Sequence, residues 1–126
     1  MINKINILNN NIKDKKIAIL GSGISGQGAA ILSNHLGANV LLSDIKKPKN
    51  IDSDISKKNI TTEFNGHTKR ILQSDLIILS PGICFESIDL YGEINKKGIP
   101  VVSEIEFASW FTKLNIVGVT GSNGKS

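Results

Sequence analysis

Short apolar runs recur along the chain from residue 17 onward, and they do not alternate regularly between apolar and polar side chains. Strands that are buried on both faces have this pattern, and such strands occur almost only in parallel sheets covered by helices. The runs therefore predict a series of buried strands at residues 17–20, 40–43, 60–64, 76–79, 101–102 and 116–119.

The stretches between these strands have helical spacing. An apolar stripe in the first of them stops at Gly37, a usual place for a helix end. Ser103 stands three residues before Glu106, which is the spacing of a capping box. We expect the apolar stripe that follows to pack against the sheet: Phe107, Trp110, Phe111 and Leu114. Helices are therefore predicted at 25–36, at 88–97 and from residue 103 onward.

Strands that alternate with helices predict an α/β fold. We expect a Rossmann-like, doubly wound and mainly parallel sheet of about five strands over residues 17–114. Residues 1–16 are rich in Asn and Lys without a clear period, so we interpret them as an N-terminal extension. Residues 115–126 would begin a second domain. Because 126 residues leave room for one ordinary domain, an activity that needs several domains would lie partly outside this chain.

The net charge of +4 does not indicate a nucleic-acid partner. Residues 1–16 hold four lysines and one aspartate, and the rest of the chain has 11 basic and 10 acidic residues. Aromatic residues make up only 5% of the sequence, whereas nucleic-acid surfaces need clustered basic and stacking side chains. No apolar run reaches the ~18 residues of a membrane span. We therefore expect neither nucleic acid nor a membrane as a partner.

The single cysteine, Cys84, excludes an intrachain disulfide and a multi-cysteine metal site. The chain also lacks a basic segment followed by an apolar core and a small-residue cleavage site. These two features predict a cytoplasmic protein. Cys84 is expected to be a buried packing residue. His35 and His67 have no ligand-like spacing to each other, and we expect them on the surface or in packing.

A glycine-rich turn follows the first predicted strand. Residues 21–26 fit the pattern G-x-G-x-x-G and open the first predicted helix. The three glycines would allow a tight turn, a close approach of the backbone to a phosphate, and close packing of helix on strand. Backbone N–H groups and the positive end of the helix dipole would then bind a diphosphate. The alternative is a tight turn without a ligand.

Two further loops are expected at the same edge of the sheet. Asp44 ends the second strand, 23 residues after Gly21, where a carboxylate can accept hydrogen bonds from a nucleotide. It could instead cap the next turn, or bind the ribose of a nicotinamide dinucleotide. Residues 80–82 form a Ser-Pro-Gly turn after the fourth strand. Because ligands bind beyond the carboxyl ends of parallel strands, the three loops should face one crevice.

A second phosphate-binding loop follows the last predicted strand. Gly124, Lys125 and Ser126 have the sequence that ends such a loop. Its N–H groups surround the phosphate oxygens, the lysine neutralises the phosphates, and the serine hydroxyl can ligate Mg²⁺. The strict pattern has a glycine where this chain has Val119, so the loop is a variant.

The order of these motifs resembles the amino-terminal part of the Mur ligases. The resemblance covers the chain from about residue 16 to residue 126. It rests on the glycine turn, on residues 80–83 (Ser-Pro-Gly-Ile), on residues 103–106 (Ser-Glu-Ile-Glu) and on the loop at 120–126. Within the family, the Ser-Pro-Gly-Ile sequence favours the member that adds D-glutamate over the member that adds alanine.

The resemblance implies a UDP-binding domain without hydride chemistry, followed by the start of an ATP-binding domain. The implied UDP contacts are Gly23, Ile24, Ser25, Gly26, Asp44, Ile45, Lys46, Ser80, Pro81 and Gly82. The implied ATP contacts are Gly121, Ser122, Asn123, Gly124, Lys125 and Ser126. Relatives carry Asp-Thr-Arg where this chain has Asp44, Ile45 and Lys46. Ile45 has no hydroxyl and Lys46 lacks the planar fork of arginine, so this departure concerns the uracil contact.

The implied reaction is ATP-dependent amide formation between UDP-N-acetylmuramoyl-L-alanine and D-glutamate. ATP would phosphorylate the alanine carboxylate, and the amino group of D-glutamate would displace the phosphate, with Mg²⁺ bound at Ser126 in the complete enzyme. We expect this chain to be a truncated, monomeric fragment without catalytic residues. We expect no bound ATP or Mg²⁺, because the helix that should follow the second loop is missing. The alternatives are a nicotinamide-dinucleotide domain of an oxidoreductase and an inactive truncated product.

Overall fold

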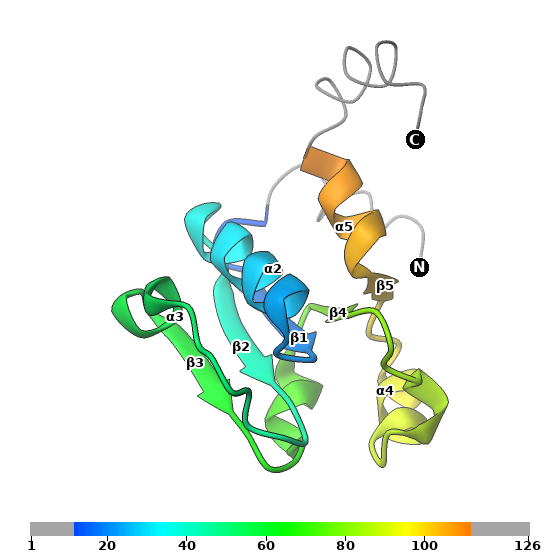
Figure 1. Ribbon diagram of the computed structural model, residues 1–126. Helices are drawn as coiled ribbons and strands as arrows, with labels where there is room; N and C mark the ends of the chain where they lie inside the picture. Colours follow the sequence, from blue (N-terminus) through cyan, green and yellow to red (C-terminus); the bar gives the residue numbers. More distant parts are fainter. Residues whose placement is uncertain (1–11, 112–126) are drawn as a thin grey trace, which may run out of the picture.

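The computed structural model describes residues 12–111, in which five strands form one fully parallel sheet (Figure 1). The strand order across the sheet is β3-β2-β1-β4-β5. The strands are β1 (Lys16–Leu20), β2 (Asn39–Ser43), β3 (Ile60–Glu63), β4 (Leu76–Leu79) and β5 (Val101–Ser103). This architecture confirms the predicted Rossmann-like parallel sheet, and the strand predicted at 116–119 lies outside the described residues.

Strand β1 is the centre of the sheet and the point where the strand order changes direction. Ile17 of β1 is in register with Val40 of β2 on one side and with Leu76 of β4 on the other. The chain therefore runs outward from β1 to β3 and then crosses over to β4 and β5. In such sheets the ligand crevice lies beyond the carboxyl ends of the strands, next to this change of direction.

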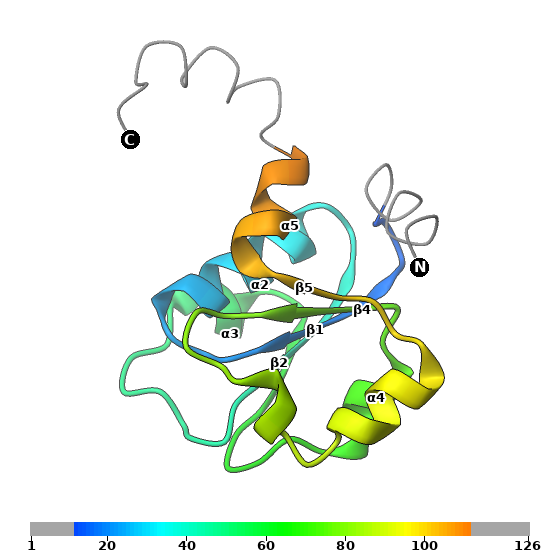
Figure 2. The same ribbon diagram turned by 90° about the vertical axis from the view of Figure 1, so that its right-hand side faces the viewer.

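Helices cover both faces of the sheet (Figure 2). The predicted helices are confirmed with small changes at their ends, as α2 (Ile24–His35), α4 (Tyr91–Lys97) and α5 (Glu104–Phe111). Three short elements were not predicted, namely α3 (Ser53–Lys57) and the 3₁₀ helices η1 (Lys69–Gln73) and η2 (Phe85–Ser87). Their few residues are too short a stretch to show a helical period. Among residues 12–111, no helix has the length and apolar character needed to cross a membrane.

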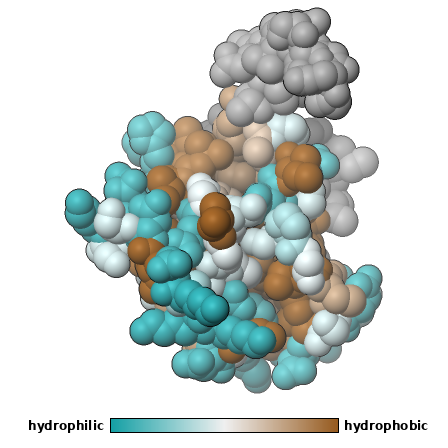
Figure 3. Space-filling view, viewed as in Figure 1, coloured by the Kyte–Doolittle hydropathy of each residue, from teal (hydrophilic) through white to brown (hydrophobic). Residues whose placement is uncertain are grey.

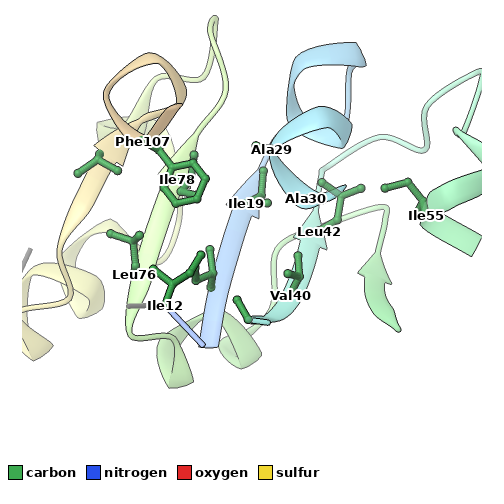
Figure 4. Packing of buried hydrophobic residues seen from close by; sticks show 13 residues of the cluster. Ile12, Ile19, Ala29, Ala30, Val40, Leu42, Ile55, Leu76, Ile78 and Phe107 are labelled. Atoms are coloured by element: carbon green, nitrogen blue, oxygen red, sulfur yellow. The ribbon is translucent and has the colours of Figure 1, made fainter. Parts of the chain in front are cut away.

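Two hydrophobic clusters form the core, one on each side of the sheet. Ile17 and Ile19 of β1 belong to the cluster under α2, α3 and α5, whereas Ala18 and Leu20 belong to the cluster next to α4 and η1. In Figure 4, Ala29 and Ala30 of α2 lie over the central strands, and their small side chains allow the helix to pack closely on the sheet. Burial on both faces explains why the apolar runs do not alternate.

Helix α5 begins with the predicted capping contact and buries its aromatic stripe. The backbone N–H of Glu106 donates to Ser103 Oγ over 3.1 Å. Phe107 is fully buried and makes edge-to-face contacts with Trp110 and Phe111, with ring centroids 5.7 and 5.0 Å apart. The expectation that this stripe packs against the sheet is therefore confirmed for the three residues that the structure describes.

The expectation for Cys84 was wrong. Cys84 is exposed, directly before η2, in the loop that follows β4. Its neighbours Pro81, Gly82 and Glu86 are also exposed, so this loop leaves the sheet and buries little apolar surface. The backbone of this loop does not enter the core, so the Cys84 side chain has no apolar surroundings in which to be buried.

Replacing Phe107 with Ala should lower the free energy of unfolding by about 3–5 kcal/mol, because it leaves a cavity under α5. Chemical denaturation followed by circular dichroism would measure this loss. Ile105→Ala is the matched control, because the Ile105 side chain on the same helix is 76% exposed. Equal losses from the two substitutions would contradict the described packing of α5.

Candidate functional site

The glycine turn brings the start of α2 onto the end of β1. Gly21 has φ +109°, a conformation that favours glycine, and a Cβ there would lie 2.7 Å from Ser80 Cβ. A Cβ on Gly26 would overlap the carbonyl oxygen of Gly21. Only glycine therefore fits at these two positions. The predicted tight turn and close helix packing are both present.

The amino end of α2 is open to solvent. Gly23 precedes the helix without a side-chain cap, and the N–H of Gln27 donates to its carbonyl oxygen over 2.9 Å. The N–H groups of residues 24–26 therefore have no acceptor within the helix. Nothing lies within 4 Å of a Cβ built on Gly23, and the Ile24 side chain is 93% exposed. Ile24 and Ser25 are exposed and Gly26 is buried, so an anion has access to the first N–H groups of α2, and the helix dipole favours its charge.

Asp44 links the loop after β2 to the glycine turn. Its Oδ2 accepts hydrogen bonds from the backbone N–H of Ser22 over 2.7 Å and from Ser22 Oγ over 2.8 Å. Its Oδ1 accepts from the N–H of Lys46 over 3.1 Å. Burial opposes ionisation of Asp44, but the hydrogen bonds from Ser22 and Lys46 outweigh it and hold the pKa below its usual value. Asp44 is therefore a charged clamp between two loops.

Ser80 joins the third loop to the same turn. Ser80 Oγ donates to the carbonyl oxygen of Gly21 over 3.2 Å, and Ser80 is buried. Pro81 and Gly82 are exposed, and Gly82 has φ +91°. The structure thus brings together all three loops that the sequence predicted. The hydroxyl of Ser80, however, supports the glycine turn, so only the next two residues are free to meet a ligand.

A cleft of about 350 Å³ lies between the glycine turn and the loop at 44–50. Three exposed lysines line it, namely Lys46, Lys47 and Lys49. Hydrophilic side chains gather on the part of the surface where β2 and β3 end (Figure 3). The lysines and the open N–H groups of α2 give this cleft a positive potential, which suits a diphosphate. Sequence reasoning missed Lys47 and Lys49, because consecutive lysines are typical of any solvated loop.

Gln27 is a buried residue of the site that sequence reasoning missed. Its Nε2 donates to the carbonyl oxygens of Ser22 and Asn50, each over 2.9 Å. Its Oε1 accepts from the N–H of Asp52 over 2.7 Å. One side chain therefore ties α2 to the glycine turn and to the far end of the lysine-bearing loop. A glutamine on a helix gives no sequence signal for this role.

A second missed group lies at the ends of β2 and β3. Ser43 Oγ donates to Glu63 Oε2 over 2.6 Å and lies 2.7 Å from His67 Nδ1. Burial opposes ionisation of Glu63, but hydrogen bonds from Ser43 and Thr68 and the charge of Arg70 lower its pKa. Burial lowers the pKa of His67, although nearby carboxylates act against this effect. The site therefore holds an ionised glutamate and a histidine that is neutral at pH 7.

The hydroxyl of Ser25 is directed to α5 and away from the cleft. It hydrogen-bonds the carboxyl group of Glu104, whose pKa burial raises above its usual value despite this bond. Glu104 Oε2 is buried without a hydrogen-bond partner among the described residues. Of the two Ser25 donors, the backbone N–H at the start of α2 is therefore the one that has no acceptor within the helix. Ile45 and Lys46 are exposed beside Asp44, as a ligand contact requires.

The predicted ATP and Mg²⁺ contacts at 121–126 lie outside the described residues. Within residues 12–111, no group of three or more His, Cys, Asp or Glu side chains could hold a metal ion.

Residues 16–88 match the family model described as the MurD N-terminal domain. The chain belongs to this family. A curated relative, the UDP-N-acetylmuramoylalanine–D-glutamate ligase of Christiangramia forsetii, is 46% identical over 114 residues. That match covers 89% of this chain but 25% of the relative, so the chain spans about a quarter of its length. The family match over residues 16–88 includes the glycine turn, Asp44 and Ser80.

Solved structures share the fold of this MurD N-terminal domain. A murein peptide ligase from Psychrobacter arcticus has a TM-score of 0.66 and 24% identity, covering 75% of this chain and 20% of its own. Shikimate dehydrogenase from Aquifex aeolicus has a TM-score of 0.57 and 17% identity, covering 86% and 49%. Ligases and dehydrogenases therefore share this sheet, and the fold alone does not identify the ligand.

Two glycine substitutions in the turn beside the cleft should differ in their effect on the free energy of unfolding. Gly26→Ala should lower the free energy of unfolding by about 3 kcal/mol, because the new methyl group overlaps the Gly21 carbonyl oxygen. Gly23→Ala should cost less than about 1 kcal/mol, because the new methyl group enters open space. Thermal and chemical denaturation would measure both. Similar losses at the two positions would contradict the described turn.

Replacing Gln27 with Leu should loosen the loop that it holds. The substitution leaves the N–H of Asp52 and two carbonyl oxygens without partners, at a cost of about 1–3 kcal/mol. Amide hydrogen exchange at Asp52 should become faster. Ser33→Ala is the control, because Ser33 Oγ is buried on the same helix without a partner among the described residues. Unchanged exchange at Asp52 in the Gln27 variant would show that the Gln27 hydrogen bonds do not hold this loop.

Proposed function

We propose that this domain binds the UDP group of UDP-N-acetylmuramoyl-L-alanine, as the amino-terminal part of an enzyme that joins this substrate to D-glutamate. Membership of the MurD N-terminal domain family and the name of the Christiangramia forsetii relative support the substrate class. The observation that carries the proposal is the open amino end of α2 beside the lysine-lined cleft.

The diphosphate would bind at the start of α2. The N–H groups of Ile24, Ser25 and Gly26 would donate to its oxygens, because the helix provides no acceptor for them. Lys46, with its two neighbours in the cleft, would balance the negative charge. The nucleoside would extend toward Asp44 and the exposed Pro81-Gly82 turn. The clamp on Ser22 would keep this arrangement formed before the ligand arrives.

The proposed parent reaction has two steps. The γ-phosphoryl group of ATP is transferred to the alanine carboxylate, which yields an acyl phosphate and ADP. The amino group of D-glutamate then attacks the acyl carbon, so that an amide forms and phosphate leaves with the bond electrons. Positioning and charge stabilisation supply most of the rate enhancement in such transfers. The described domain would contribute by holding the UDP end of the substrate.

The ATP side of the proposal rests on the sequence of the second loop. Gly121, Ser122, Asn123, Gly124 and Lys125 would surround the phosphates, and Ser126 would ligate Mg²⁺ in the complete enzyme. Bound Mg²⁺ would neutralise charge on the phosphoryl group. The proposed location is the cytoplasm, which fits a chain whose single cysteine is free.

A nicotinamide dinucleotide is the main competing ligand, because dehydrogenases share the fold. In that case Asp44 would accept hydrogen bonds from a ribose. Here Asp44 Oδ2 already accepts two hydrogen bonds from Ser22, and Oδ1 accepts one from Lys46. The carboxylate thus has little free capacity for the two ribose hydroxyls that a nicotinamide dinucleotide would place on it, which counts against that ligand.

Calorimetric titration of the 126-residue chain with UDP and with NAD⁺ tests the proposal. UDP should bind more tightly, and its affinity should fall as salt rises, because the contacts are ionic. Lys46→Met should weaken UDP binding severalfold. Lys97→Met is the matched control, since Lys97 is exposed at the end of α4, away from the cleft. Tighter binding of NAD⁺ than of UDP would refute the assignment.

A further inference from the structure

His67 lies where the loops after β2, β3 and β4 come together. It follows a turn in which Asn65 has φ +72° and Gly66 has φ +141°. The N–H of Gly66 donates to the carbonyl oxygen of Asp44 over 3.1 Å, so this turn is tied to the loop after β2. The carboxylates of Asp44, Glu63 and Asp89 all act on the imidazole electrostatically, and Asp89 belongs to the segment after β4. His67 therefore lies beside the region proposed for the nucleoside.

The hydrogen-bond network determines which ring nitrogen of His67 carries the proton. Glu63 accepts hydrogen bonds from Ser43 Oγ, from the Thr68 N–H and from Thr68 Oγ, and its carboxylate is 3.7 Å from Arg70. An ionised carboxylate can only accept. The single hydroxyl proton of Ser43 is therefore used in the bond to Glu63.

The Ser43 oxygen must then accept its second hydrogen bond, the 2.7 Å contact with His67 Nδ1. This contact requires a proton on Nδ1, so the neutral imidazole carries none on Nε2. No described residue donates to Nε2, and the ring is only partly buried. Nε2 is thus a fixed acceptor without a partner, and it matches a ligand that presents an N–H group.

We propose that His67 Nε2 accepts the N3–H of a uracil base and thereby selects uracil over cytosine. Uracil carries a hydrogen on N3, whereas N3 of cytosine is itself an acceptor and would face Nε2 without a proton between them. This inference rests on the proposed function, because it assumes that a pyrimidine nucleotide occupies the site.

Parallel titrations with UDP and CDP test the proposal. The chain should prefer UDP by about tenfold at pH 7.5, as expected for one base-reading hydrogen bond. His67→Phe keeps an aromatic ring without an acceptor, and it should bind the two nucleotides within about twofold of each other. His35→Phe is the control, because His35 is exposed at the far end of α2, and it should keep the preference for UDP. A His67 variant that still prefers UDP tenfold would overturn the proposal.

Two measurements on the unmodified chain make the test independent of whether the variant folds. The ¹⁵N resonances of His67 should show a protonated Nδ1 and a bare Nε2, and the opposite tautomer would overturn the proposal. Below the pKa of His67, which lies under the usual 6.5, Nε2 gains a proton and becomes a donor. The UDP/CDP affinity ratio should therefore fall on acidification and drop below one when Nε2–H faces the N3 acceptor of cytosine, and a constant ratio would also refute the proposal. Failure of both nucleotides to bind would instead refute the proposed function.

Discussion

The structure depends on how closely α2 approaches the end of β1. Gly26 lies against the carbonyl oxygen of Gly21, and Gly21 in turn lies against Ser80. These contacts leave no room for a side chain, so the helix starts directly above the central strand. Its free N–H groups therefore point to the edge where β2 and β4 also end. Every other part of the proposed ligand site is arranged around this helix end.

Polar side chains then connect the loops into one unit. Asp44 holds Ser22, Ser80 holds Gly21, and Gln27 holds both the glycine turn and the loop at 50–52. All of these contacts except that of Gln27 with the glycine turn join segments that are more than 20 positions apart in the sequence. A ligand would meet a cleft that is already formed, so little conformational entropy would be lost on binding. The lysines of the loop after β2 remain exposed, so their charge is available to a negatively charged ligand.

The fold was predictable because burial on both faces leaves continuous apolar runs such as 76–79, and glycines mark the helix ends. The convergence of Asp44 and Ser80 on the glycine turn followed from the parallel topology. Sequence could not show that Asp44 uses its oxygens within the protein, since that depends on the conformation of Ser22. Gln27 and His67 act through contacts that only the folded loops create. Cys84 was misjudged because its residue type suggests burial, whereas its loop leaves the sheet.

The central position of β1 also has a consequence for the order of folding. Strands β1 and β2 can pair through one helical crossover, but β1 meets β4 only after the intervening segment has returned to the sheet. The contact between Ser80 and Gly21 spans 59 positions of sequence. Closing such long loops costs entropy before any contact compensates for it. The glycine turn therefore gains its contact with Ser80 only when β4 has joined the sheet, and a fragment that ended before β4 would lack this contact although it holds every residue that lines the cleft.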